Sequence, residues 1–354
     1  MYKLAIVPKI HFKYEYSRAY GSQHHYSHIN KCLNTILNKK KINFKIIYSK
    51  NFFLKFFYLK NLSKFDGILF IGIDQFSKHV ININKKSDIF LWSFNQIEWA
   101  NNESFLDKID IVFEQSTRNL NKFNINQNEI IYTPLAFQHD YNFKKNNKLK
   151  NNIQQHDLVF IGTLDRSRRE TSKTHRIDIL EGLLKKDLKI LILNGRGETK
   201  IEKNLINKLK KYKNFTYINS FGEPSDYKLG KYVLNLPFHE LGSLENINLN
   251  WGMSKKELEN EIWLVHWDTF RCIGSKCNMI TYDCKEFRNL GLNDNNCHFY
   301  KNNIENIPKI VDEIFLIVKS DIKKEIDKKT FQQNTYFARW EIITQNIIKK
   351  ISSK

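Results

Sequence analysis

Two doubly wound, Rossmann-like α/β domains in tandem are the fold class that the sequence predicts, and three observations support this prediction. The chain has 354 residues, more than the roughly 250–300 that a single hydrophobic core usually serves. Short apolar runs alternate with segments of helical spacing, which indicates parallel βαβ units rather than a sandwich or a bundle. A polar stretch near residue 145 divides this alternation, so the pattern occurs twice.

The first domain is predicted over residues 1–140. Strands are expected at 3–8, 44–49, 66–72, 89–94, 109–113 and 130–133. Residues 26–38 place apolar side chains at the spacing of an amphipathic helix. Residues 141–156 offer almost nothing to bury and are interpreted as a linker.

The second domain is predicted over residues 157–333, where the alternation resumes. Strands are expected at 157–162, 188–194, 215–218, 232–236 and 279–282, and helices at 174–185, 201–212, 257–272, 304–318 and 335–351. The last segment, 334–354, is a candidate helix that crosses back to the first domain. Ligands of open parallel sheets bind beyond the carboxyl ends of the strands, so a cleft lined by these loops from both domains is the expected site.

The composition excludes several classes of protein. Hydrophobic residues make up 41% of the chain, with 13 Gly and 5 Pro, which argues against a disordered or fibrous chain. No uncharged apolar run approaches the roughly 18 residues of a membrane span, and the first residues do not form a cleavable signal, so a cytoplasmic protein is expected. The five cysteines include no Cys-x-x-Cys pair, which argues against a disulfide framework and a zinc ribbon.

The formal net charge is +20, with 57 Lys and Arg against 37 Asp and Glu. Such a surface attracts polyanions, namely nucleic acid, anionic lipid or phosphorylated substrates. The codon usage of an AT-rich genome would enrich lysine without any such partner, and both explanations stay open. The lysines are scattered and no nucleic-acid-binding motif occurs, so no specific nucleic acid is expected as a partner.

The predicted strands at 157–162 and 188–194 end in glycine turns that contain arginine. The residues concerned are Gly162, Arg166, Arg168, Arg169, Gly195 and Arg196. Glycine lets the backbone approach a ligand and guanidinium groups bind phosphate oxygens, so a diphosphate would fit at these turns. A solvated arginine face and a tight left-handed turn are the alternatives. No Gly-x-Gly-x-x-Gly follows the first strand and no Walker A pattern occurs, which disfavours NAD and P-loop chemistry.

Four segments resemble a known family in their order along the chain. Residues 266–283 run from a helix end through a small-residue turn and a short strand to an Asp. This segment resembles the C-terminal signature of GT-B glycosyltransferases, particularly the CgeB-like group of spore-maturation-like proteins. The other similar segments are 160–162 with the arginines after it, 232–237 with Asn235, and 334–339 with its Thr-Tyr-x-x-Arg. The resemblance covers roughly residues 157–345.

The resemblance implies a GT-B fold and a glycosyltransferase that needs no obligatory metal and no cofactor. The second domain would hold a nucleotide-sugar donor, and the first would present a hydroxyl of a glycan or lipid-linked glycan in capsule or lipopolysaccharide assembly. The donor-binding residues would be Gly162, Arg166, Arg168, Arg169, Gly195, Arg196, His239, Glu240, Asp268, Thr269, Phe270, Arg271, Gly274 and Ser275. His239 and Glu240 lie in a long insertion, for which a solvated surface excursion is the alternative.

The sequence departs from the family pattern where the donor's ribose would bind. Arg271 stands where a Glu is expected, and Asp268 is the nearest acidic residue before it. Lys276 occupies the usual glycine position, with Gly274 two residues earlier. A different nucleotide, for instance a CMP-linked sugar, and a local shift in register would both explain the change.

The catalytic base is expected in the first domain, beyond the ends of its strands. His24 and His25 follow the first strand, Asp74 follows the third, and Glu98 follows the fourth. Each is a candidate general base for the acceptor hydroxyl. His24 and His28 are one helical turn apart, but no carboxylate lies at a convincing spacing, so a metal site is not expected.

Residues 50–60 combine aromatic side chains with lysines at five-residue steps. An interfacial helix of this kind buries its rings among anionic headgroups, which adds the inner face of the cytoplasmic membrane to the expected partners. A core helix with lysines reaching to solvent is the alternative.

Two other functions stay open at this point. One is a transferase of another activated group, such as a phosphoryl-linked moiety, on the same scaffold. The other is a basic nucleic-acid-binding protein, which the net charge alone suggests.

Overall fold

The computed structural model forms two compact units, which are described separately. Unit 1 comprises Met1–Gln138 and Thr335–Lys354, and unit 2 comprises His139–Asn334. The structure describes residues 2–8, 36, 42–46, 62, 64–72, 75–83, 86–93, 108–114, 129–134, 136–137, 156–164, 175–194, 199–220, 226–236, 267–301 and 306–353.

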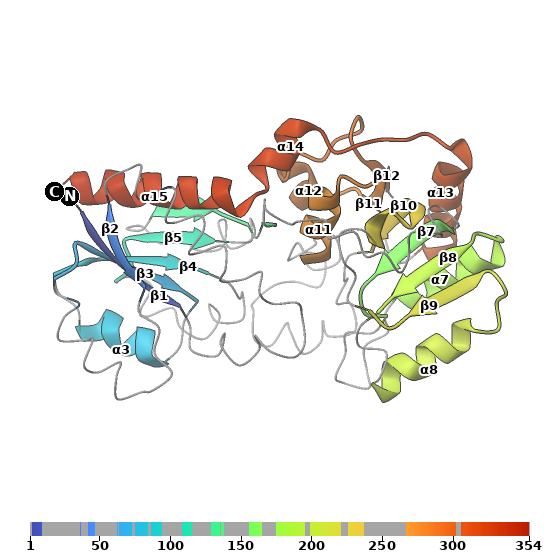
Figure 1. Cartoon of the computed structure of the whole chain (residues 1–354), viewed down its shortest axis with the longest axis horizontal. Helices are drawn as coiled ribbons and strands as arrows, with labels where there is room; N and C mark the ends of the chain where they lie inside the picture. Colours follow the sequence, from blue (N-terminus) through green and yellow to red (C-terminus); the bar gives the residue numbers. More distant parts are fainter. Residues whose placement is uncertain are drawn as a thin grey trace. The chain divides into compact units, whose positions relative to one another are not determined.

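Unit 1 is built on a parallel sheet with the strand order β2-β1-β3-β4-β5-β6 (Figure 1). The strands are β1 (Lys3–Pro8), β2 (Asn43–Ile46), β3 (Gly67–Ile71), β4 (Asp88–Trp92), β5 (Ile111–Glu114) and β6 (Glu129–Tyr132). All residues of β3, β4 and β5 are buried, as expected for strands covered on both faces. The strand order reverses direction between β1 and β3: β2 lies on one side of β1, and β3 to β6 follow on the other side. Helix α3 (Gln75–Ile83) connects β3 to β4.

Helix α15 (Tyr336–Ser352) packs along the sheet of unit 1 although it follows unit 2 in sequence (Figure 1). Trp340 is fully buried and meets Trp92 of β4 edge to face, with ring centroids 5.2 Å apart. A Cβ added at Gly67 would lie 3.1 Å from Cδ1 of Ile351. The helix and the sheet are therefore in close contact at both ends of α15.

The start of α15 is fixed by hydrogen bonds within unit 1. Thr335 caps the helix by accepting from the N–H of Ala338 at 3.2 Å and pairs with Phe137 in a parallel bridge. Nε of the buried Arg339 donates to the carbonyl of Pro134 at 3.0 Å. Burial lowers the pKa of Arg339 to about 10, so its guanidinium remains charged at neutral pH. The Thr-Tyr-x-x-Arg segment thus secures the return of the chain to unit 1.

Unit 2 contains a second parallel sheet, with the order β12-β11-β10-β7-β8-β9. Its strands are β7 (His156–Ile161), β8 (Ile190–Leu193), β9 (Phe215–Ile218), β10 (Gly230–Asn235), β11 (Met279–Tyr282) and β12 (His298–Tyr300). Its helices are α7 (His175–Lys185), α8 (Lys200–Leu209), the 3-10 helix η4 (Asp226–Lys228), α11 (Trp267–Ser275), α12 (Lys285–Asn289), α13 (Ile307–Ser320) and α14 (Lys328–Gln333). The strand order reverses between β7 and β10, which is the topology of a Rossmann domain.

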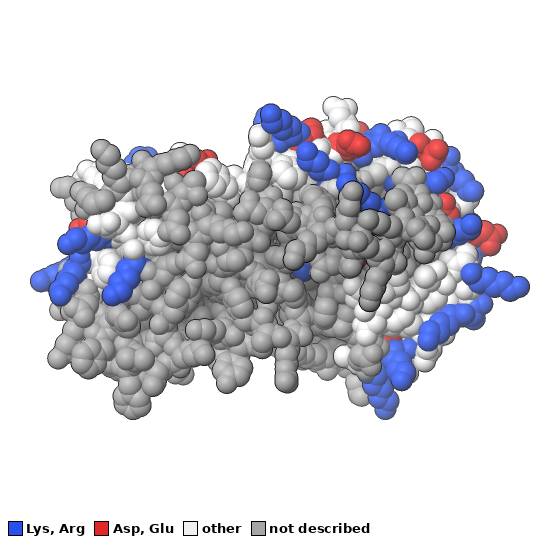
Figure 2. Space-filling model, in the orientation of Figure 1, with Lys and Arg blue, Asp and Glu red and all other residues white. Residues whose placement is uncertain are grey.

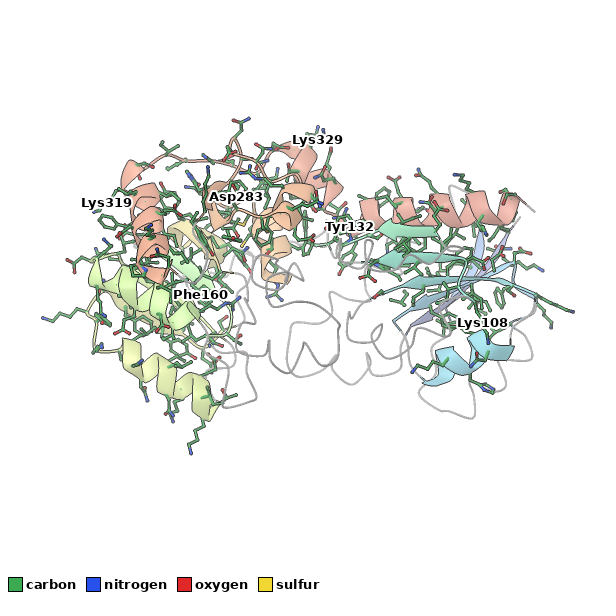
Figure 3. The ribbon with its side chains drawn as sticks, turned by 180° about the vertical axis from the view of Figure 1, so that it is seen from behind. Lys108, Tyr132, Phe160, Asp283, Lys319 and Lys329 are labelled. Atoms are coloured by element: carbon green, nitrogen blue, oxygen red, sulfur yellow. The ribbon has the colours of Figure 1, made fainter. Side chains whose placement is uncertain are left out.

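The core of unit 2 lies between this sheet and helices α7 and α13. Phe160 of β7, labelled in Figure 3, is buried there with Ile190, Tyr232 and Ile310. Gly182 lets the two helices approach closely, because a Cβ at that position would lie 2.6 Å from Cγ2 of Val311.

The turn before β12 is held against α14 by polar side chains. Gly291 has a φ of +87°, and its carbonyl accepts from Oγ1 of Thr330 at 3.0 Å and Nδ2 of Asn296 at 3.1 Å. Asp327 caps α14 by accepting from the N–H of Thr330 at 2.7 Å. This cluster fixes the segment that leads from unit 2 toward α15.

Both units are parallel α/β layers, so the predicted fold class is confirmed. Within the described ranges no helix has the length and apolar character needed to cross a membrane. On the face that Figure 2 shows, the described Lys and Arg side chains are spread over each unit, with Asp, Glu and uncharged residues between them. Of the predicted helix at 26–38 only Ile36, which is helical and buried, is described, and the aromatic segment 50–60 falls outside the described residues.

Candidate functional site

The carboxyl edge of the unit 2 sheet is the candidate site, because the strand order reverses there between β7 and β10. In open parallel sheets such a reversal opens a crevice for ligands. Gly162 follows β7 with a φ of +143°, a conformation that favours glycine. Its N–H donates to the carbonyl of Leu193 at 3.0 Å. The predicted donor residue Gly162 therefore lies at the edge of this crevice.

Arg176, in the first turn of α7, joins the two strands that flank the reversal. Its Nη1 donates to the carbonyl of Thr163 at 2.8 Å, and its Nη2 donates to the carbonyl of Leu236. These carbonyls lie just beyond β7 and β10. The guanidinium also lies over the ring of Phe160, 5.4 Å from its centroid. Arg176 was not among the residues that the sequence predicted for the site.

Glu202 holds the same turn from the side of α8. Its buried carboxylate accepts from the N–H of Leu164 at 2.9 Å and from Nδ2 of Asn194, the residue that follows β8. Thr199 caps α8 by accepting from the N–H of Glu202 at 3.4 Å. The sequence Thr-x-x-Glu is typical of a capping box, yet here the carboxylate contacts the strand ends.

A buried network of neutral side chains joins β10, β11 and α11. Nδ2 of Asn235 donates to Oγ1 of Thr269 and to Oγ1 of Thr281, each at 3.0 Å. The sheet register pairs Asn235 with Thr281. The predicted donor residue Thr269 thus uses its hydroxyl to fix α11 to the end of β10. Thr281 was missed, although a polar residue inside a buried strand was the available signal.

The other predicted residues of α11 differ in their surroundings. The side chain of Phe270 is buried in the interior, and Oγ of Ser275 donates to the carbonyl of Arg271 at 2.8 Å. Arg271 and Gly274 are half-buried. At 1.5 Å per residue, Ser275 lies about 9 Å from Thr269 along the helix axis, so it is nearer the amino edge of the sheet. Asp268 belongs to α11, but its side chain is outside the described set.

Eleven predicted site residues lie outside the described residues. They are His24, His25, Asp74, Glu98, Arg166, Arg168, Arg169, Gly195, Arg196, His239 and Glu240. The strands that precede three of them, β1 and β3, are neighbours at the order reversal of unit 1. Their roles therefore stay predictions.

Asp283 follows β11 at the same edge and forms an ion pair with Arg288 (Asp283 in Figure 3). Nε and Nη2 of Arg288 donate to its two carboxylate oxygens at 2.8 and 2.9 Å. These bonds raise the pKa of Arg288 above its usual value. The guanidinium carbon lies 3.8 Å from the ring centroid of Phe299. A ribose hydroxyl at Asp283 would have to share the carboxylate with Arg288.

The described part of the chain shows no cluster of metal-binding side chains, and burial raises the pKa of one of its cysteines, Cys284. No group of three His, Cys, Asp or Glu side chains able to hold a metal ion occurs among these residues. Burial raises the pKa of Cys284 to about 12, so its thiol is protonated at neutral pH.

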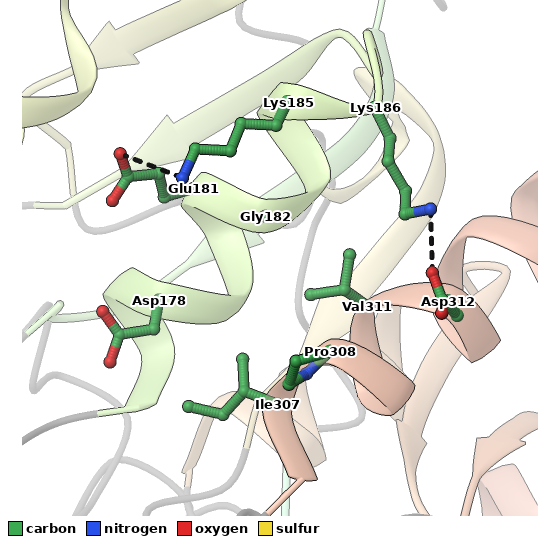
Figure 4. A pocket seen from close by; sticks show the side chains of 9 residues that line it. All are labelled: Asp178, Glu181, Gly182, Lys185, Lys186, Ile307, Pro308, Val311 and Asp312. Carbon is green, nitrogen blue, oxygen red and sulfur yellow. Dashed lines mark ion pairs between the residues drawn. The ribbon is translucent and has the colours of Figure 1, made fainter.

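A surface groove of about 340 Å³ lies between α7 and α13 (Figure 4). Its lining residues are Asp178, Glu181, Gly182, Lys185, Lys186, Ile307, Pro308, Val311 and Asp312. All belong to α7, the turn after it or α13, and an ion pair of 2.8 Å between Lys186 and Asp312 spans the two helices. The groove is a seam between packed helices and lacks residues from the turns that follow the strands.

Comparison with solved structures gives full-length matches to glycosyltransferases. Sucrose-phosphate synthase from Thermosynechococcus elongatus matches with a TM-score of 0.63 at 9% identity, and both chains are covered completely. A glycosyltransferase from Rickettsia africae matches with a TM-score of 0.57 at 14% identity over 99% of this chain and 98% of that one. The chain has the GT-B fold.

A third GT-B structure, HepE from Anabaena in complex with UDP, matches with a TM-score of 0.55 at 9% identity over the whole of both chains. No protein-family model matches the sequence, and no curated protein matches it either. At these identities the matches establish the GT-B fold and leave the activity to be argued from the site.

Proposed function

We propose that this protein is a metal-independent glycosyltransferase that moves a sugar from a nucleotide-sugar donor to a hydroxyl of a cell-surface glycan. The supporting observation is the carboxyl edge of unit 2, where Arg176, Glu202 and the Asn235 network order the turns around the strand reversal. HepE, to which this chain is similar in structure, has been solved with UDP and with UDP-glucose. In this chain a nucleotide would bind at the carboxyl edge of the unit 2 sheet.

Unit 2 would hold the donor. The backbone at Gly162 allows close approach, and Arg166, Arg168 and Arg169 in the next segment would contact the diphosphate. Gly195 and Arg196, after β8, would form a second anion contact. Arg271, which replaces the family's Glu, would contact the ribose, and Asp268, Glu240 and Asp283 are the alternatives.

Unit 1 would bind the acceptor, a glycan or lipid-linked glycan of capsule or lipopolysaccharide assembly. His24, His25, Asp74 and Glu98 are the candidate bases that take the hydroxyl proton. The acceptor oxygen forms a bond to the anomeric carbon while the bond from that carbon to the diphosphate breaks. Arginines and helix N-termini would stabilise the departing charge.

The proposed location is the cytoplasm, with contact to the inner face of the membrane through residues 50–60. Their lysines and aromatic rings suit an anionic surface. The CgeB-like group remains the proposed subgroup, on the strength of the four sequence segments.

Transfer of another activated group on the same fold is the second candidate. The observation in its favour is Arg271, which reverses the charge that GT-B enzymes place at the ribose. Among the described residues on the face that Figure 2 shows, Lys and Arg alternate with Asp, Glu and uncharged residues and do not form the basic stripe that nucleic-acid recognition uses.

A thermal-shift series with UDP, GDP, CMP, ADP and dTDP tests donor binding. The true nucleotide at 100 times its Kd should add about 2.7 kcal/mol to the free energy of unfolding, because only the folded state binds it. Inorganic pyrophosphate at the same concentration is the control for a bare anion effect. Equal melting temperatures with all five nucleotides and with buffer would contradict the proposal.

A further inference from the structure

The turn that follows β7 is fixed by two buried side chains of opposite charge. Arg176 donates to the carbonyl of Thr163, and Glu202 accepts from the N–H of the next residue, Leu164. Their side chains come from different helices and are only 5% and 3% exposed. Two adjacent peptide groups are thus held from two directions.

Each of these charges also reaches a neighbouring strand end. Arg176 donates to the carbonyl of Leu236 after β10, and Glu202 accepts from Nδ2 of Asn194 after β8. The β7 turn is therefore tied to the ends of the strands on both sides of it. A change in Arg176 would alter the spacing of the turns after β7 and β10, and a change in Glu202 would alter that of the turns after β7 and β8.

Burying charged side chains at this place is costly, because an ion that leaves water loses its hydration. At the opposite edge of the same sheet Nε2 of His298 and the hydroxyl of Tyr232 both donate to the carbonyl of Ile322, and Nζ of the half-buried Lys324 donates to the carbonyl of Cys297 at 3.1 Å. The two charged side chains that are almost fully buried, Arg176 and Glu202, stand where the strand order reverses.

We infer that Arg176 is a positioning residue for the nucleotide-sugar donor, an inference that rests on the proposed function. One planar guanidinium spans the reversal and sets the separation of the turns after β7 and β10. The turn after β7 leads to the predicted phosphate-binding arginines, and the turn after β10 leads to His239 and Glu240. Arg176 acts through the backbone at Thr163 and Leu236, and Glu202 fixes the orientation of the same turn.

The test is the Kd of UDP, followed by GDP, ADP, dTDP and CMP, for the full-length wild type and three variants. Arg176→Met removes both hydrogen-bond donors of the guanidinium while nearly keeping the side-chain volume. It should raise the Kd at least about tenfold, the size expected when charge-assisted hydrogen bonds that order a site are lost. Arg176→Lys keeps the charge but lacks the planar fork, so it should also weaken binding, by a smaller factor.

His298→Leu is the matched control, because it removes a buried donor to a backbone carbonyl at the amino edge of the same unit. It should lower the melting temperature while the Kd stays at the wild-type value. The salt dependence of the Kd should be the same for Arg176→Met and the wild type, since a positioning residue does not pair with the phosphates.

Three outcomes would overturn the inference. Wild-type affinity in Arg176→Met would exclude a positioning role. Full affinity in Arg176→Lys, together with a weaker salt dependence of the Kd in Arg176→Met, would mean that the charge itself contacts the phosphates. An equal loss of affinity in His298→Leu would reduce the effect to stability. If the wild type binds neither CMP nor any of the four diphosphates, the donor proposal itself fails, and this result is distinct from normal binding in both the wild type and Arg176→Met.

Discussion

Trp340→Ala should lower the free energy of unfolding of unit 1 by about 3–5 kcal/mol, the usual cost of removing a fully buried large aromatic side chain. Trp340 is 0% exposed and packs edge to face on Trp92 at the centre of the sheet. It is also one of the side chains through which α15, which follows unit 2 in the chain, packs on the sheet of unit 1. Urea denaturation followed by circular dichroism measures the effect.

Gln345→Ala is the matched control on the same helix, because Gln345 is exposed. It should change the free energy of unfolding by less than about 0.5 kcal/mol. A Trp340→Ala variant as stable as Gln345→Ala would mean that α15 does not contribute to the core of unit 1.

Gly291→Ala should lower the free energy of unfolding of unit 2 by about 2–5 kcal/mol. The backbone at Gly291 has a φ of +87°, which costs an alanine about 1–2 kcal/mol. Its Cβ would also collide with Nε2 of Gln333 and lie 3.1 Å from Oγ1 of Thr330, and such overpacking adds about 1–3 kcal/mol. Differential scanning calorimetry would show a lower melting temperature.

Asn295→Ala provides the comparison in the neighbouring turn, because this residue is exposed and its backbone N–H keeps its bond to Oδ1 of Asn293. Equal melting temperatures for Gly291→Ala and Asn295→Ala would show that the turn relaxes freely. The cluster around Thr330 would then play no part in fixing the segment before α15.

The strands could be predicted because a parallel sheet covered on both faces needs continuous apolar runs. Ile-Leu-Phe-Ile in β3 and Ile-Leu-Ile-Leu in β8 are apolar at every position, as expected for strands that are buried on both faces. Strand β12 was missed because its three residues, His298–Tyr300, include a histidine that is buried only by tertiary contacts. Helix α14 was also missed, since its six residues depend on the Asp327 cap and on contacts with the Gly291 turn.

The site could be predicted only in part, because sequence spacing indicates strand ends but not the bonds between them. Gly162 and Thr269, predicted from a glycine turn and from a family-like segment, lie at the carboxyl edge of the unit 2 sheet, and their part in donor binding stays a prediction. Arg176 and Glu202 were missed because their partners are backbone groups 13 to 60 residues away. Nothing in the local sequence distinguishes them from solvated charges at a helix start.

Incubation of the full-length protein with the nucleotide-sugar of the best-binding nucleotide, beginning with UDP-glucose, tests the glycosyltransferase proposal most directly. Water can replace the acceptor hydroxyl, so slow, enzyme-dependent release of free sugar and nucleoside diphosphate in equal amounts is the predicted result. At least one of Arg166→Ala, Arg168→Ala and Arg169→Ala should slow this release about tenfold or more, because the departing diphosphate loses a charged contact. Tight binding with the donor intact, in the presence and absence of glycan acceptors, would contradict the account and leave a nucleotide-binding protein without transferase activity.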